Sequence, residues 1–338
     1  MWRSVKHIIQ EHNNFLLTTH VNPDGDGVGA ACALTELLIK QDKRVCFVCD
    51  SPIPQKLTFL NFRNNHAIYD PSVSYDDVEV VILLDTHRKD RIGAVANIID
   101  HSRVVVCIDH HRAAESFTKY SVIEPNACSV GAMIYTLFKE MGFDLNLWAA
   151  TGIYTSVICD TGRFSYSSTS RKAHKIADEC IKLGVDPDEM HSRLFQHISL
   201  AQIKMFAQAL NGMETYLDNR VIVEQISQSD YEKDWPDLEH VDLEYIHEFN
   251  KHIENIECVV LLRELGDHEV RVSLRSVGDL DVGVVLHNFG GGGHRQAAGA
   301  TCKGSLQEVK SKVLDALKQA LAQPKCENLP LLEPETLQ

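Results

Sequence analysis

Residues 20–26 read His-Val-Asn-Pro-Asp-Gly-Asp and directly follow the apolar run Phe15-Leu16-Leu17. This stretch places one imidazole and two carboxylates where a strand is expected to pass into a loop. Such side chains bind divalent cations. Acidic loops are common, however, and many are solvated turns, so this stretch alone leaves a metal site and an ordinary turn about equally favoured.

Three further apolar runs end in the same kind of side chain. Residues 80–84 precede Asp85, residues 104–108 precede Asp109-His110-His111, and residues 155–159 precede Asp160. Apolar, β-branched runs separated by helical patterns predict buried parallel strands, whose carboxyl ends meet in one crevice. A turn or a helix cap is the usual role of a single Asp after a strand, but that explanation would have to hold four times. We therefore expect these side chains to converge: His20, Asp24, Asp26, Asp85, Asp109, His110, His111 and Asp160.

The length and composition are those of a two-domain protein. At 338 residues, with 44% hydrophobic and 24% charged residues, each domain has enough chain to bury a core. No apolar run approaches the roughly 18 residues of a membrane span, and the first residues lead into an amphipathic segment instead of a signal peptide. We therefore expect a cytoplasmic protein that does not bind membranes.

The ten cysteines agree with a reducing compartment, because most of them lie inside apolar patterns where a small buried thiol is expected. Cys46 and Cys49 have the spacing of a ligand pair. They lie in a strand pattern, however, which would direct the two sulfurs to opposite faces. A structural role is favoured over zinc binding.

The net charge of −14 restricts the partners. A protein that follows long nucleic acid usually carries a basic face, and the sequence has no basic run. A small phosphorylated ligand held by a few cationic side chains is more compatible with this charge.

Residues 1–187 alternate strand and helix patterns and predict a doubly wound α/β domain with a parallel sheet. A short strand is expected at 44–48. Helices are expected at 29–39, 54–62, 91–99, 129–141, 148–158 and 171–183.

The rest of the chain predicts a linker and a smaller α/β domain. Residues 188–212 have the pattern of one long amphipathic helix, within a linker that we place at 188–214. The second domain, 215–323, is expected to contain strands at 221–226, 258–264, 269–274 and 282–287, and helices at 243–255 and 306–321. Residues 324–338 are proline-rich and acidic, which is typical of a flexible tail.

The second domain has a glycine-rich segment, Gly290-Gly291-Gly292-Gly293-His294-Arg295. Consecutive glycines lose much backbone entropy, a cost that is usually tolerated where the main chain approaches something closely or takes a positive φ. Backbone N–H groups at the expected start of a helical turn would suit an anion, whereas a flexible surface loop is the plainer alternative. His294, Arg295 and Arg275 favour phosphate binding.

Taken together, the ordered motifs resemble those of the DHH phosphoesterase superfamily with a DHHA1 domain. The resemblance covers residues 10–322, and within the superfamily it is nearest to the NrnA-like oligoribonucleases (nano-RNases) and 3′-phosphoadenosine-5′-phosphate (pAp) phosphatases. The motifs that carry it are Asn22-Pro23-Asp24-Gly25-Asp26, Asp85-Thr86, Asp109-His110-His111, Asp160-Thr161-Gly162 and Gly290-Gly291-Gly292-Gly293-His294.

The resemblance implies two divalent ions, usually Mn²⁺ with Mg²⁺ or Co²⁺ as alternatives, in an active site between the two domains. One ion would be held by His20, Asp24 and Asp85, and the other by Asp26, Asp85, His110 and Asp160. His111 would face the substrate and act as a catalytic residue, and Asp109 would orient His110 or His111. Residues 291–293, with His294, Arg295 and Arg275, would hold the substrate.

The activity implied is hydrolysis of short RNA and of linear dinucleotides such as pGpG and pApA, with pAp phosphatase activity as a further expectation. The alternatives are a cyclic dinucleotide phosphodiesterase, a RecJ-like exonuclease, and a metal-dependent nucleotide sensor without turnover. Short length, acidic charge and the lack of an extra nucleic-acid-binding domain disfavour the RecJ-like activity, and long duplexes are not expected as partners. The sequence leaves open whether the protein forms a homodimer.

Three residues near the motifs depart from this pattern or extend it. His87 follows Asp85-Thr86 where many relatives have a small or acidic residue. We expect it to be exposed, with an approach to the metals as the alternative. Arg112 and Arg163 directly follow motif residues and could contact phosphate, although a surface or capping role is at least as well supported.

Overall fold

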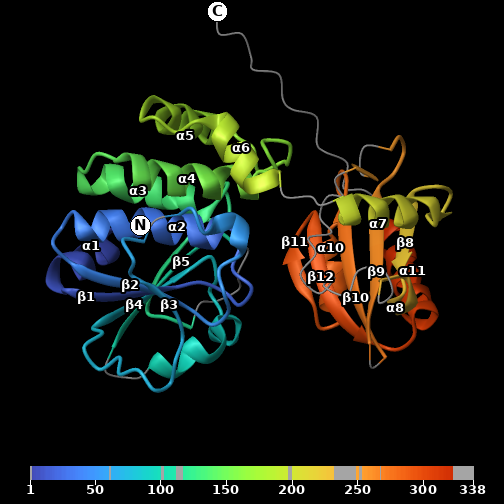
Figure 1. Ribbon diagram of the computed structural model, residues 1–338, viewed down its shortest axis with the longest axis horizontal. Helices are drawn as coiled ribbons and strands as arrows, with labels where there is room; N and C mark the ends of the chain where they lie inside the picture. Colours follow the sequence, from blue (N-terminus) through green and yellow to red (C-terminus); the bar gives the residue numbers. More distant parts are fainter. Residues whose placement is uncertain are drawn as a thin grey trace, which may run out of the picture. The chain divides into compact units, whose positions relative to one another are not determined.

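The structure is a computed structural model that describes residues 2–60, 62–99, 103–111, 117–196, 200–231, 249–250, 253–266 and 268–322. The chain divides into two compact units, Met1–His197 and Ile198–Gln338 (Figure 1). The finer division into domain, linker and tail remains a prediction. Arg112, the tail at 324–338 and most of the helix expected at 243–255 lie outside the described residues.

The described part of the first unit contains a parallel sheet in the order β3-β2-β1-β4-β5-β6. This confirms the predicted doubly wound α/β fold. The short outer strands β3 and β6 were not predicted, because three or four partly exposed residues carry little periodic signal. The strands are β1 (Asn14–Thr18), β2 (Arg44–Cys49), β3 (His66–Ile68), β4 (Val80–Leu84), β5 (Val104–Asp109) and β6 (Tyr120–Ile123).

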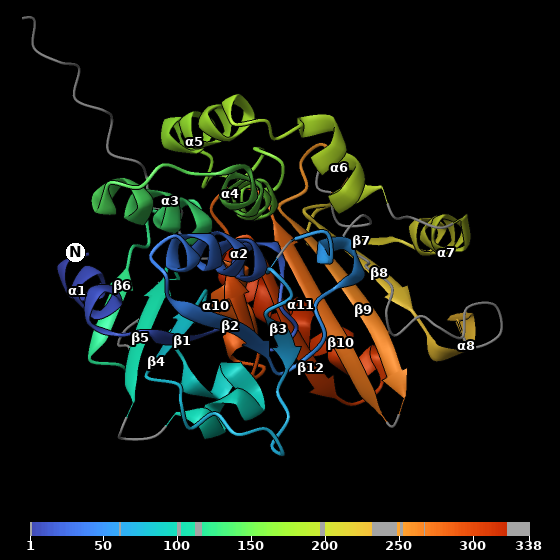
Figure 2. The ribbon, with the colours of Figure 1, turned by 60° about the vertical axis from the view of Figure 1, so that its left-hand side comes forward.

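Helices cover this sheet, as Figures 1 and 2 show. Helices α2 and α3 contact the strands, α4 packs on α2 and α3, and α5 packs on α4. The opposite face is covered by η2 (Lys89–Ile98), a 3₁₀ segment. The helices are α1 (Arg3–Glu11), α2 (Gly25–Ile39), α3 (Val130–Met141), α4 (Leu147–Asp160), α5 (Arg171–Lys182) and α6 (Pro187–Phe195).

Successive residues of the central strands enter different cores. Leu16 and Val81 pack with Ile92 of η2, whereas Phe15 and Leu17 pack with the helices of the other face. Both faces of the sheet are therefore buried, which explains the continuous apolar runs. The same alternation places Cys46 on the η2 side and Cys49 on the helical side, as predicted for structural cysteines.

The sequence predicted residues 155–159 both as a strand and as part of a helix at 148–158, and the helix is confirmed. Residues 155–159 form the last part of α4, which begins after Asn146, whose side chain accepts a hydrogen bond from the backbone N–H of Ala149. Nearly every residue of this helix from 149 to 158 is buried, so its sequence is apolar on all sides and lacks the helical period. Asp160 therefore sits at the end of a helix.

Two predicted helices are 3₁₀ segments. Among the described residues of 54–62, only η1 (Gln55–Leu57) is helical. Within 91–99, the 3₁₀ segment η2 is interrupted at Gly93, which has φ 57°.

Helix α2 begins four residues earlier than expected, at Gly25. The side chain of Asp24 accepts hydrogen bonds from the backbone N–H groups of Asp26 and Gly27, at 3.0 and 3.2 Å. Asp24 is therefore the N-cap, which satisfies two donors of the first turn. The acidic motif is the start of a helix as well as a loop.

The described part of the second unit contains a mixed sheet in the order β11-β12-β10-β9-β8-β7. The strands predicted at 221–226, 258–264 and 269–274 are confirmed, and α11 covers one face of this sheet. Its elements are α7 (Leu200–Asn211), β7 (Glu214–Tyr216), β8 (Val221–Ile226), α8 (Gln228–Tyr231), β9 (Cys258–Gly266), β10 (Glu269–Ser276), α10 (Val282–His287), β11 (Gly292–His294), β12 (Ala297–Lys303) and α11 (Leu306–Ala322).

Two predictions for this half of the chain were wrong. Residues 282–287 form helix α10, because Asp281 caps the backbone N–H of Val284 and the buried positions follow helical spacing, with Val284 exposed. The single helix expected at 188–212 is divided, since α6 ends at Phe195 and α7 begins at Leu200.

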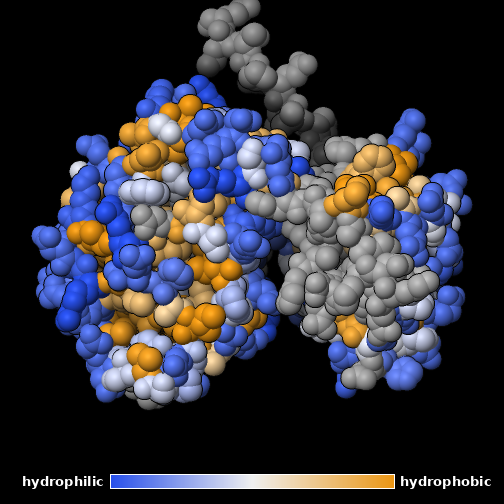
Figure 3. Space-filling model, viewed as in Figure 1, coloured by the Kyte–Doolittle hydropathy of each residue, from blue (hydrophilic) through white to orange (hydrophobic). Residues whose placement is uncertain are grey.

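The surface has an ordinary character. On the face of the first unit seen in Figure 3, apolar residues form separate patches among hydrophilic ones. Such patches are normal, because a folded domain lacks enough polar surface to cover itself. In the described part of the chain, no helix combines the length and the apolar character that crossing a bilayer requires.

Helices α2 and α4 approach each other at two glycines. A Cβ atom on Gly152 would lie 2.5 Å from the carbonyl oxygen of Gly29. We expect Gly152→Ala to lower the free energy of unfolding by about 1–3 kcal/mol, the usual effect of overpacking. Urea denaturation should detect this loss, whereas Thr151→Ala, one residue earlier on α4, should leave the midpoint nearly unchanged. Equal midpoints for the two variants would contradict the close packing.

Glu224 of β8 is fully buried, and burial raises the pKa of its carboxyl group to about 7, although the hydrogen bond from Asn250 opposes the shift. The folded protein therefore holds this proton more tightly than the unfolded chain. The associated stability is complete below the ordinary pKa and is lost as the pH rises through 7. We expect Glu224→Gln to stabilise the second unit at pH 8 by about 3 kcal/mol.

Urea denaturation at pH 5 and pH 8 measures this effect. The parent protein should lose stability between the two values, and Glu224→Gln should remove most of that loss. The exposed Glu254→Gln is the matched control. If it flattened the pH dependence as much as Glu224→Gln, the assignment to Glu224 would be refuted.

Candidate metal centre

Three neighbouring strands place histidine and aspartate side chains at one edge of the first sheet. His20 lies two residues beyond β1, Asp85 directly follows β4, and His110 directly follows β5. β1, β4 and β5 are adjacent and parallel, and the strand order reverses at β1. Open parallel sheets bind ligands at such a reversal. Asp26 and Asp160 reach the same place from the first turn of α2 and the end of α4.

The first group of candidate ligands consists of His20, Asp24 and Asp85. His20 Nε2 lies 3.3 Å from Asp85 Oδ2 and 3.8 Å from Asp24 Oδ2. His20 Nδ1 lies 2.8 Å from the carbonyl oxygen of Val21. A carbonyl only accepts, so Nδ1 carries a proton and Nε2 is directed at the carboxylates, as in histidines that bind metals.

The second group surrounds His110, which is buried. Its Nε2 lies 3.4 Å from Asp26 Oδ2, 3.5 Å from Asp160 Oδ2 and 3.7 Å from Asp85 Oδ1. Its Nδ1 lies 3.0 Å from the carbonyl oxygen of Ala127. The same tautomer argument therefore applies to His110 as to His20.

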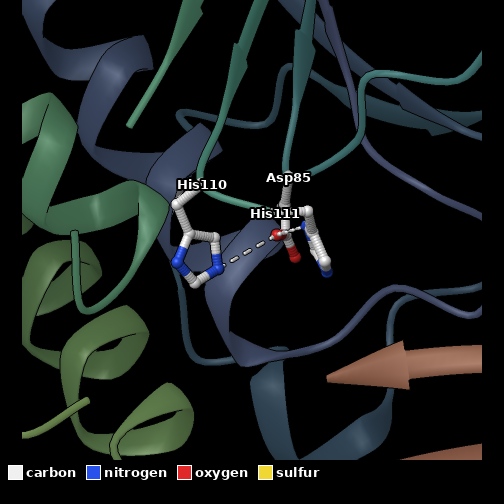
Figure 4. Close-up of side chains that lie close together, drawn as sticks. All are labelled: Asp85, His110 and His111. Atoms are coloured by element: carbon white, nitrogen blue, oxygen red, sulfur yellow. Dashed lines mark ion pairs between the residues drawn. The ribbon is translucent and has the colours of Figure 1, made fainter. Parts of the chain in front are cut away.

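Asp85 belongs to both groups through different oxygens. Oδ2 faces His20 and Oδ1 faces His110, and Figure 4 shows the rings of His110 and His111 on either side of its carboxylate. Asp85 Oδ1 is buried, and no described residue donates a hydrogen bond to it. Asp85 also has φ 60°, a conformation that costs energy in a non-glycine residue and is concentrated at functional sites. A cation would compensate this oxygen.

Asp26 is fixed by donors from two other helices. The backbone N–H of Val130 donates to both carboxylate oxygens at 2.9 Å, and that of Gly131 donates to Oδ1 at 3.2 Å. The hydroxyl of Ser156 also donates to Oδ1 and lies 2.8 Å from that of Ser129. The N-terminus of α3 thus stabilises the anion of Asp26 and aims Oδ2 at His110.

These two serines were missed by the sequence analysis. Ser129 had a usable signal, because a serine directly before an apolar helical pattern predicts an N-cap, and its hydroxyl does cap α3. Ser156 lies inside an apolar helix and had no such signal.

The electrostatics of the cluster favour a cation. Burial disfavours the charged imidazoles, but Asp24 and Asp85 outweigh it and raise the pKa of His20 to about 11. In the same way, Asp160, Asp26 and Asp85 outweigh burial and raise the pKa of His110 to about 10. Burial raises the pKa of Asp160 to about 7, and burial with the neighbouring carboxylates also raises the pKa of Asp26. The crowded carboxylates thus favour extra protons on the imidazoles and on each other, and divalent ions could take the place of these protons.

Asp109 orients His111 instead of His110, a choice that the sequence left open. Asp109 is fully buried, and its Oδ1 accepts from His111 Nδ1 at 2.7 Å and from the His111 backbone N–H at 3.1 Å. Its Oδ2 accepts from His87 Nδ1 at 2.6 Å. Burial alone would raise the pKa of Asp109, but these hydrogen bonds hold it well below its usual range.

The sequence had predicted that His87 is exposed. In the structure it is half-buried and hydrogen-bonded to Asp109. His111 Nδ1 also lies 3.4 Å from Asp85 Oδ1. Figure 4 shows the imidazole of His111 beside the carboxylate of Asp85.

The glycine-rich segment of the second unit does not begin a helix, contrary to the expectation. It follows α10 and enters the β11–β12 hairpin. Gly290 and Gly293 have positive φ, and a Cβ on Gly291 or Gly293 would lie 2.3 or 2.4 Å from a carbonyl oxygen of β12. The protein's own backbone therefore accounts for these glycines. Gly290 and Gly292 have open space where a Cβ would lie, and of these two Gly290 has the positive φ.

The predicted substrate residues around this hairpin partly come together. Ala297 pairs with Arg275 on one side and with His294 on the other, so the three side chains form one row on one face of the sheet. In the next row, Gly299 pairs with Ser273 and Gly292. The small side chain of Ala297 thus lies between the guanidinium of Arg275 and the imidazole of His294.

Arg295 is placed differently from Arg275 and His294. Its guanidinium donates to the backbone carbonyl and the carboxylate of Asp279, at 2.8 and 2.9 Å. Arg163 is half-buried and stacks on the ring of Phe195.

Sequence comparison agrees with both units. Residues 14–180 match the DHH family, N-terminal domain, and residues 218–323 match the DHHA1 domain. The chain therefore belongs to the family of proteins that combine a DHH domain with a DHHA1 domain.

Individual relatives extend over nearly the whole chain. It is 27% identical to the "Bifunctional oligoribonuclease and PAP phosphatase NrnA" of Thermus thermophilus, over 90% of this chain and 89% of that protein. An exopolyphosphatase-related protein from Bacteroides fragilis has the same fold, with a TM-score of 0.84, 24% identity and coverage of 94% and 95%. RecJ of Thermus thermophilus in complex with Mn²⁺ has a TM-score of 0.53 and 14% identity, over 94% of this chain and 54% of RecJ.

Proposed function

We propose that the chain is a metal-dependent phosphoric ester hydrolase that degrades short oligoribonucleotides and linear dinucleotides, such as pGpG and pApA, to mononucleotides. We also propose that it removes phosphate from pAp. The Thermus relative named for these two activities matches it along nearly its whole length. The observation that carries the proposal is Asp85, whose two carboxylate oxygens face two different clusters of histidine and aspartate.

Two divalent ions fit this arrangement. His20, Asp24 and Asp85 would hold one, and Asp26, Asp85, His110 and Asp160 would hold the other. Oxygen and imidazole ligands without thiolate suit Mn²⁺, with Mg²⁺ and Co²⁺ as alternatives. When bound, such ions activate water and stabilise the charge of the attacking and leaving oxygens in phosphoryl transfer.

His111 would supply the proton that the leaving oxygen needs. Burial opposes its charge, but Asp109 and Asp85 outweigh it and raise the pKa of His111, which favours the protonated imidazole. Asp109 accepts from Nδ1, so the proton for the leaving oxygen would come from Nε2. His111 would therefore be a catalytic residue, and Asp109 would position it.

The second unit would hold one end of the substrate. Arg275 and His294 lie in one row with Ala297 between them, which leaves room for a phosphate or a sugar. Gly292 and Gly293 would offer backbone N–H groups to the same ligand, and Gly291, whose N–H donates to the carbonyl of Leu286 at 3.0 Å, would line the site. Arg295 would add positive charge, although its bond to Asp279 reduces its reach.

The net charge of −14 favours short substrates over long nucleic acid. A cyclic dinucleotide phosphodiesterase and a RecJ-like exonuclease would use the same metal chemistry, so substrate length and form must separate them. Turnover with Mn²⁺ should be measured on pAp, pGpG, RNA from dimer to decamer, cyclic dinucleotides and long single-stranded DNA. We expect pAp and the dinucleotides to react fastest and turnover to fall steeply with length.

Each contrary result of this panel has a clear meaning. Fastest turnover of cyclic dinucleotides or of long DNA would replace the proposed substrate class. No turnover of any member, with Mn²⁺ bound, would support a nucleotide sensor instead of an enzyme.

Asp85→Asn tests the shared ligand. It keeps the shape of the side chain but removes the charge that both ions would use, so Mn²⁺ affinity should fall by at least about tenfold at both sites and turnover should be abolished. Equilibrium dialysis and isothermal titration calorimetry measure the stoichiometry and the affinity. The control Asp178→Asn removes a solvent-exposed charge from α5 and should leave both unchanged. Near-normal turnover of Asp85→Asn would refute the bridging role.

His111→Ala separates catalysis from metal binding. We expect both ions to remain bound, because the His111 imidazole is engaged by Asp109, while kcat falls by about 10²–10⁴, the range for a lost general acid. Metal analysis and steady-state kinetics check both statements. Loss of Mn²⁺ from this variant would instead make His111 a metal ligand.

A further inference from the structure

Asp109 connects two imidazoles that come from different loops. His111 lies two residues beyond Asp109 on β5, whereas His87 lies in the turn that follows β4. Both Nδ1 atoms are within 2.7 Å of the carboxylate, one at each oxygen. The second imidazole has no role in the function proposed above.

The turn that carries His87 is held in place by its neighbours. The buried Thr86 accepts a hydrogen bond from the Arg88 backbone N–H at its hydroxyl, and its carbonyl lies 3.3 Å from Cys107 Sγ. The side chain of His87 is 18% exposed, and Asp109 is completely buried. His87 is therefore a fixed partner of Asp109, not a surface side chain that meets it by chance.

This second bond restricts how Asp109 can turn. A carboxylate has a broad, roughly two-fold preference about its last side-chain torsion, so bonds to one oxygen alone leave its plane adjustable. His111 engages Oδ1, and His87 engages Oδ2. With both oxygens engaged, the direction in which Oδ1 accepts from His111 Nδ1 is defined, and so is the direction of His111 Nε2.

We infer that His87 is a positioning residue that acts through Asp109 to hold His111 in the orientation needed to protonate the leaving oxygen. This inference rests on the proposed function. A purely structural role would instead make His87 a contributor to stability, with no preference for one step of the reaction.

Two substrates distinguish these roles. One is the panel member with the highest turnover, whose leaving alkoxide needs a proton. The other is the p-nitrophenyl ester of thymidine 5′-monophosphate, whose p-nitrophenolate leaves without one. His87→Ala should lower kcat on the first by about 10–100-fold, the usual cost of losing an outer partner, and leave KM and Mn²⁺ content unchanged. Turnover of the p-nitrophenyl ester should be nearly that of the parent.

Three further variants complete the experiment. His87→Asn can place an amide donor near the position of Nδ1 and should recover part of the lost kcat. In a His111→Ala background, His87→Ala should have no additional effect, because the residue through which it acts is absent. His12→Ala is the control: it removes another half-buried imidazole from the first unit, one bonded to the carbonyl of Ile8, and should leave both substrates unaffected.

Several results would overturn the inference. An equal loss on both substrates would indicate a structural role, and so would an undiminished effect of His87→Ala in the His111→Ala background. If the parent enzyme is active and His87→Ala leaves kcat unchanged, His87 has no role in the reaction, and the proposed function still holds. A parent protein that turns over neither kind of substrate would refute the proposed function, and this inference with it.

Discussion

The burial of Asp85 between two imidazoles is the interaction on which the rest of the first unit depends. The charge of a carboxylate that is shielded from water must be compensated by other groups. Here each oxygen of Asp85 faces a different histidine. The positive φ of Asp85 directs its side chain into the cluster at the end of β4. Asp24, Asp26 and Asp160 surround Asp85, so carboxyl groups outnumber the imidazoles of His20 and His110. A cation at this edge of the sheet would therefore reduce the repulsion between the carboxylates.

Helix packing supplies two candidate ligands that do not come from the ends of the strands. Gly29 and Gly152 let α2 and α4 approach closely, and these helices carry Asp26 and Asp160. The start of α3 then fixes Asp26 through backbone donors and the paired hydroxyls of Ser129 and Ser156. A change in the apolar contacts between α2 and α4 would therefore change the distance between the carboxylates of Asp26 and Asp160.

The sequence predicted the parallel sheet and the gathering of most ligands, because continuous apolar runs and the side chains after them depend on local pattern and sheet geometry. It gave the run before Asp160 two conflicting interpretations, a strand at 155–159 and a helix at 148–158, because a helix buried on every side has no amphipathic period; the structure confirms the helix. It misassigned 282–287, a run too short to distinguish helix from strand. The contacts of His87 and Ser156 could not be predicted, because their partners lie 22 and 130 residues away and meet them only in the folded chain.

The two carboxylate oxygens of Asp24 have different contacts. Its Oδ1 accepts from the first backbone N–H groups of α2, and its Oδ2 faces His20. Loss of function on replacing it with alanine would be ambiguous, since the helix start and the ion site would be damaged together. Asparagine caps helices as well as aspartate does but carries no charge. At this one position, the architecture and the chemistry of the site can therefore be separated by exchanging a single oxygen for nitrogen.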